Sequence, residues 1–144
     1  MAKDNLSREA EAQLGDLVAA VHERLLEFQV LRAAGRFAGA AYLGRYVVEL
    51  LLKCAICKQL GKTRLPIIFH SHDLEKLIYF TGLEEQLEAE PEKYLSFEQI
   101  KGHEIDDLRY QNPSRVTYAD CQGWDIWLND PSKGLVPWFL EKLK

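Results

Sequence analysis

The sequence lacks a long apolar run, a net positive charge and an even set of cysteines for disulfides. Each absence reduces the range of functions that the protein could have. No apolar stretch approaches the roughly 20 residues that a membrane-spanning helix needs, so we expect no membrane association. The polar segment from Met1 to Ser7 lacks the apolar region of a secretory signal peptide, which predicts a soluble, cytoplasmic protein. The 3 cysteines are an odd number, so free thiols are expected.

The charge balance argues against a chain that is basic overall and binds polyanions, and the glycine pattern argues against a conventional ATPase or dehydrogenase. The formal net charge is −4 at pH 7, so the chain as a whole has no electrostatic reason to attract a polyanion, although its 18 Lys and Arg leave room for a local basic patch. The glycine-rich phosphate loops of P-loop ATPases and dinucleotide-binding enzymes are also missing. We therefore expect no cofactor.

What the sequence does contain is helical periodicity, without the alternation typical of strands and without internal repeats. From about Leu6 to Ala34, apolar residues recur at steps of three and four, which predicts one amphipathic helix that ends at Gly35. We predict a single all-α domain over residues 1–144, an antiparallel bundle of about five helices. A later helix is expected at Ser71–Thr81, with Ser71 as N-cap, followed by a surface helix interrupted at Pro91. Further helices are expected at Ser96–Leu108 and Leu135–Leu143, and between them along a stripe of Tyr118, Cys121, Trp124 and Leu128.

The segment from Arg36 to Leu60 is apolar on nearly every side. Its only polar line is Arg45, Glu49 and Lys53, each four residues from the next and therefore on one helix face. A helix of this kind is buried all round, and one chain of this length does not easily cover it. We favour a homodimer interface here over a helix at the centre of one bundle.

The middle of the chain resembles HEPN domains, a helical family of higher eukaryotes and prokaryotes. The resemblance consists of Gly35-Arg36-Phe37, an alanine-rich helix carrying Glu49-x-x-x-Lys53, and His72-Asp73-Leu74, with Arg109-Tyr110 further on. It implies a helical bundle that commonly dimerises and that works on nucleotides or RNA. Many HEPN proteins pair with a small nucleotidyltransferase in toxin–antitoxin or defence systems, so a nucleotidyltransferase-like partner is expected.

The resemblance also raises the question of RNA cleavage. Catalytic HEPN proteins are metal-independent endoribonucleases with an Arg-x(4–6)-His motif, whereas others lack the motif and bind without cutting. Here Arg109 is followed by no histidine through the turn at Asn112-Pro113. Arg64 and His70 have the required spacing but lie in a loop before the third helix, and His103 with Arg109 has it in reversed order. No catalytic residue is assigned, and Arg109, His70 and Arg64 are the candidates.

Two interpretations of Glu49 are equally consistent with the sequence. It belongs either to a solvated ladder with Arg45 and Lys53, worth about 0.3–0.5 kcal/mol per pair, or to a buried pair with Arg109, because a buried carboxylate needs such a partner. The candidate ligand-binding or dimer residues are Glu49, Lys53, Arg45, Arg109, Tyr110, His72 and Asp73.

Three other patterns have structural explanations. His70 and His72 are two apart and do not share a helix face, so no metal site is expected. Cys54 and Cys57 have redox spacing but fall within the most apolar helix, which predicts inert core thiols. The three tryptophans have helical spacing and leucine neighbours, which favours core filling over base stacking.

Three functions of different classes follow from the sequence. The first is a HEPN-type nucleotide- or RNA-binding module, and the second is a divergent metal-independent endoribonuclease. The third is a structural helical dimer whose acidic surface, from Glu84 to Glu92, binds a protein.

Overall fold

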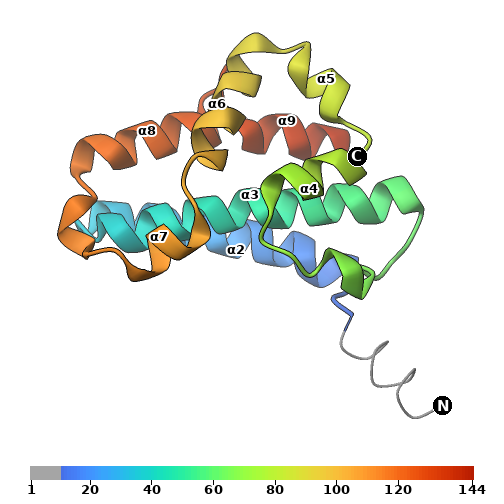
Figure 1. Cartoon of the computed structure of the whole chain (residues 1–144), viewed down its shortest axis with the longest axis horizontal. Coiled ribbons are helices and arrows are strands. Elements are labelled where there is room, and N and C mark those ends of the chain that lie inside the picture. Colours follow the sequence, from blue (N-terminus) through green and yellow to red (C-terminus); the bar gives the residue numbers. More distant parts are fainter. Residues whose placement is uncertain (1–10) are drawn as a thin grey trace.

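The computed structural model describes residues 11–144, and all regular structure in that range is helical (Figure 1). Those residues contain no strand, only a single bridge between Gln13 and Arg64, so the all-α prediction is confirmed. No helix among them is long and apolar enough to cross a membrane. The helices are α2 (Leu14–Ala33), α3 (Phe37–Leu60), η1 (Ile67–Phe69), α4 (Leu74–Phe80), α5 (Glu84–Glu88), α6 (Pro91–Lys101), α7 (Ile105–Tyr110), η2 (Pro113–Arg115), α8 (Tyr118–Asn129) and α9 (Leu135–Lys142).

Helices α2 and α3 form a hairpin around Gly35, whose φ of 75° is the left-handed conformation that ends helices. Helix α2 begins later than predicted, and residues 6–10 of the predicted helix lie outside the described range. The segment just before α2 is extended instead. Its backbone pairs with the loop after α3, because Leu65 N donates to Ala12 O and Leu14 N donates to Thr63 O.

Helix α3 is the centre of the molecule, and α2, α4, α7, α8 and α9 all pack against it (Figure 1). Every residue from Val47 to Cys57 is buried within this single chain. The argument that one chain cannot cover this helix is therefore wrong, because five helices surround it. The homodimer itself stays a prediction, but it needs a surface other than the buried stretch of α3 from Val47 to Cys57.

The chain between α4 and α8 is divided into more and shorter helices than predicted. The surface helix is interrupted at Pro91 as predicted, because α5 ends at Glu88 and Pro91 occupies the first turn of α6, where the first N–H of a helix needs no partner within it. The helix expected over Ser96–Leu108 is two helices, α6 and α7, separated at Gly102. The predicted N-cap Ser71 is also wrong, because Asp73 caps α4 by accepting a hydrogen bond from Lys76 N at 3.2 Å.

Helix α8 packs against α3 and also contacts α2, because Asp125 accepts a hydrogen bond from Gln29 and pairs with Arg32. Cys121, Trp124 and Leu128 are buried as predicted, but Tyr118, the first member of the predicted stripe, is 59% exposed. Trp124 fills the core and Trp127 packs partly buried against it, which confirms core filling for these two. All three cysteines are free and buried, as expected.

Candidate functional site

A buried ionic cluster lies in the middle of α3. Helical spacing places Arg45, Glu49 and Lys53 in one line, and all three are buried, with the carboxylate of Glu49 completely so. Lys53 Nζ lies 3.1 Å from one carboxylate oxygen, and Arg45 Nη1 lies 3.5 Å from the other. The solvated-ladder interpretation is therefore wrong, since solvent does not reach the pairs.

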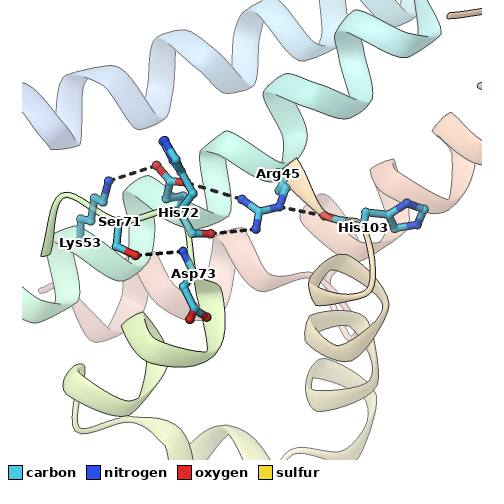
Figure 2. Close-up of polar contacts among 7 residues, drawn as sticks. Arg45, Lys53, Ser71, His72, Asp73 and His103 are labelled. Atoms are coloured by element: carbon cyan, nitrogen blue, oxygen red, sulfur yellow. Dashed lines mark hydrogen bonds and ion pairs between the residues drawn. The ribbon is translucent and has the colours of Figure 1, made fainter. Parts of the chain in front are cut away.

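The loop before α4 adds a histidine to this cluster. His72 Nδ1 lies 2.8 Å from Oε1 of Glu49, so the ring covers the carboxylate from outside while its own side chain is 48% exposed (Figure 2). Glu49 thus has three basic neighbours, and both of its oxygens are engaged. A carboxylate bonded to one imidazole nitrogen orients the ring and leaves the other nitrogen available to a ligand.

Arg45 fixes two loops against α3. Its Nε donates a hydrogen bond to the carbonyl of His103 at 2.9 Å, and its Nη2 donates to the carbonyl of His72 at 2.8 Å (Figure 2). Burial lowers the pKa of Arg45, and the nearby carboxylate of Glu49 opposes that shift. The guanidinium therefore holds together the segments before α4 and between α6 and α7.

Arg109 does not pair with Glu49, so the second interpretation of Glu49 is also wrong. Its exposed guanidinium lies over the ring of Tyr42, 5.9 Å from the ring centre. A hydrogen bond from Arg109 to Tyr42 raises the pKa of the arginine. The buried carboxylate is neutralised from its own helix by Arg45 and Lys53, and the ring of His72 contacts it from the loop.

A second group of candidates gathers at the N-terminal end of α3. There α7 and η2 pack against the helix, and a groove of about 680 Å³ is lined by Arg36, Phe37, Pro113 and Ser114, among others. Tyr110 is 78% exposed, and Arg36 and Arg115 are exposed as well. We call this the arginine–tyrosine surface, which comprises Arg36, Tyr42, Arg109, Tyr110 and Arg115.

Two cavities flank the ionic cluster, and His72 lines both. The larger, of about 570 Å³, is bordered by Arg45 and by several carboxylates of the chain between α4 and α7. The smaller, of about 300 Å³, is lined by Lys53, Glu49, Tyr46, His70 and His72 together with apolar side chains. Burial, and secondarily the charge of Glu49, raises the pKa of Tyr46.

The remaining predicted residues have separate roles. His70 is exposed and lines the smaller cavity, whereas Arg64 forms a backbone bridge with Gln13. Asp73 is the cap of α4. Among residues 11–144, no three His, Cys, Asp or Glu side chains are grouped closely enough to hold a metal ion.

Sequence reasoning missed Tyr42, Tyr46 and the carbonyl of His103. Tyr42 lies three residues before Arg45, and Tyr46 lies three residues before Glu49. Residues three apart are neighbours on a helix, so this spacing could have placed both tyrosines beside the polar line. The His103 contact involves only backbone, and no pattern of side chains predicts it.

Comparisons of the chain with protein-family models, with curated proteins and with solved structures find no match. The HEPN resemblance therefore stays a prediction from the residues that carry it.

Proposed function

We propose that this chain is a HEPN-type module that binds RNA or nucleotides through the arginine–tyrosine surface, without cleaving them. The observation that supports this proposal is that α7 and η2 both pack on the N-terminal part of α3, where Arg109 lies over Tyr42 and Arg36 lines a groove with Pro113 and Ser114. Arg36 and Arg109 both belong to the motifs of the resemblance, although they are far apart in the sequence.

The chemistry of this surface suits a single-stranded nucleic acid. Arginine side chains contact phosphates, and an exposed aromatic ring stacks on a base, which contributes roughly 1–3 kcal/mol per base. Among residues 11–144, Arg36 and Arg115 form no ion pair, so their charges are available to a ligand. Asp106 acts on Arg109 from the same helix, so Arg36 and Arg115 carry the uncompensated charge.

The absence of a suitable base supports binding rather than cleavage. The three positions that the catalytic motif allows for the histidine after Arg109 hold Ser114, Arg115 and Val116. Of the other candidates, His70 lines the smaller cavity beside Glu49 while Arg109 packs on Tyr42, and Arg109 does not line that cavity. Metal-independent cleavage needs a base and a cation at one phosphate.

The test is binding of a fluorescent single-stranded RNA in EDTA, followed by anisotropy and by gel. We expect saturable binding that weakens with salt, and about ten-fold weaker binding in Tyr110→Ala and in Arg109→Ala, as expected from loss of one stacked base or one phosphate contact. Tyr79→Ala, which removes another exposed tyrosine, and Lys133→Ala are the matched controls. Absence of binding to RNA and to ATP, or equal loss in the controls, contradicts the proposal.

The homodimer and the nucleotidyltransferase-like partner belong to the same proposal. Since the stretch of α3 from Val47 to Cys57 is covered within one chain, the dimer requires another surface. Light scattering of the pure protein at micromolar concentration measures the mass directly. A dimeric mass supports the proposal, and a monomeric mass contradicts the homodimer without affecting RNA binding.

A further inference from the structure

The smaller cavity beside Glu49 is distinct from the arginine–tyrosine surface and is rich in hydrogen-bond donors. Lys53 and Tyr46 reach it from α3, and His70 and His72 reach it from the loop before α4. Figure 2 shows Lys53 and His72 converging from these two elements. The cavity therefore collects polar groups from segments that are separate in the sequence.

The side chains that line this cavity have unused hydrogen-bond donors. The oxygens of the one carboxylate among them are already engaged. An ammonium group has three N–H donors, and among residues 11–144 Lys53 uses one of them, on Glu49. The Tyr46 hydroxyl and the His70 ring have no hydrogen-bond partner in the same range. Glu49 is the one carboxylate that lines the cavity, and His72, Arg45 and Lys53 already occupy its oxygens.

The fixed charges beside the cavity balance. Arg45 and Lys53 both pair with the buried carboxylate of Glu49, and Asp73 and Glu104 act on Arg45 from its other side. Lys53 and Glu49 therefore form a balanced pair at the cavity wall. The case for an anion accordingly depends on the spare donors that line the cavity rather than on an excess of charge.

We propose that this cavity binds a phosphoryl group, held by Lys53, Tyr46, His70 and His72. A tetrahedral phosphate presents acceptor oxygens in several directions, which matches donors that arrive from α3 and from the loop, whereas a planar carboxylate presents only two oxygens. The two histidines donate to the anion when protonated, and a bound dianion favours that form. The cavity of about 300 Å³ accommodates inorganic phosphate or the phosphate end of a nucleotide.

The experiment is calorimetric titration with inorganic phosphate at constant ionic strength, with sodium chloride as the reference salt. We expect saturable heat and a rise in melting temperature that chloride does not give. His70→Gln and Tyr46→Phe are each expected to weaken phosphate binding about ten-fold, the usual effect of losing a hydrogen bond to a charged group. His70 is exposed and Tyr46→Phe removes only a hydroxyl, so both variants test the cavity without relying on Lys53→Met, which also disturbs a buried pair.

The matched control is His22→Gln, because His22 is an exposed histidine on α2 that lies outside the cavity. The source of the phosphoryl group is identified by comparing the affinity for AMP with that for adenosine. The affinity for 5′-phosphorylated RNA is likewise compared with that for 5′-hydroxyl RNA. Absence of a phosphate-specific effect, or equal affinity in His70→Gln, Tyr46→Phe and the control, overturns the proposal. RNA that binds through Arg109 and Tyr110 regardless of its 5′ end leaves the proposed function standing, so the two failures are distinguishable.

Discussion

His72 Nδ1 and Glu49 Oε1 lie 2.8 Å apart, and this contact joins a loop to the middle of the central helix. The carboxylate is completely buried, whereas about half of the imidazole is exposed. One side of the ring therefore contacts the buried carboxylate, and the other side lines the two cavities. The same pair links the stability of the molecule to its candidate ligand site.

Replacing Glu49 by Gln should destabilise the protein strongly. The change keeps the shape of the side chain but leaves the buried ammonium of Lys53 without a counter-charge and removes the carboxylate that pairs with Arg45, which typically costs about 3–5 kcal/mol. Urea unfolding measures the free energy of unfolding. The control Glu141→Gln removes an exposed pair with Lys144 and should change it by less than about 0.5 kcal/mol. A similar small effect for Glu49→Gln would contradict the role of this carboxylate.

Arg45→Lys should loosen two loops although it keeps the charge. A lysine offers one compact ammonium in place of the planar fork, so it cannot reach the carbonyls of both His72 and His103. We expect a loss of about 2 kcal/mol from one unsatisfied buried group, and faster hydrogen exchange in residues 102–105 and 71–74. Unchanged exchange in both segments would show that Arg45 does not hold them.

The sequence predicted the helical class and the large helices because their apolar spacing is long and regular. It placed Arg45, Glu49 and Lys53 on one face for the same reason. It left open whether Glu49 on this face is solvated or buried, since burial depends on which loops cover it. His72 and His103 reach the cluster from far along the chain, and no local pattern specifies that approach.

The errors in the short helices have a common physical origin. Between α4 and α8 the helices have at most 11 residues, too few for periodicity to define their ends. Pro91 and Gly102 act there as boundaries, the first as a helix start and the second as a stop. The Arg109–Glu49 pair, one of the two interpretations of Glu49, does not form, because Arg109 lies instead over the half-buried ring of Tyr42 on the same helix.

Gly44 sits where α3 and α8 approach most closely, so Gly44→Ala should be destabilising. A Cβ there would lie 3.1 Å from both Leu128 and Trp124, which are buried and cannot move freely. Overpacking of this kind costs about 1–3 kcal/mol. Gly123→Ala in α8 is the matched control, because its Cβ would meet only ordinary contacts, the nearest at 3.4 Å. There the higher helix propensity of alanine should stabilise by about 0.5–1 kcal/mol. Equal effects in thermal unfolding would contradict the close packing.

The buried thiol of Cys54 should make the protein lose stability in alkaline solution. Burial raises its pKa from 9.0 to about 12. Above pH 9 the unfolded chain therefore releases this proton while the folded chain keeps it, so unfolding becomes easier as the pH rises toward 12. Below pH 9 the contribution is fully present. The slope is about 1.4 kcal/mol per pH unit for one thiol. Cys54→Ala has a constant packing cost but should remove this slope, and parallel pH profiles of the two proteins in urea unfolding would contradict the prediction.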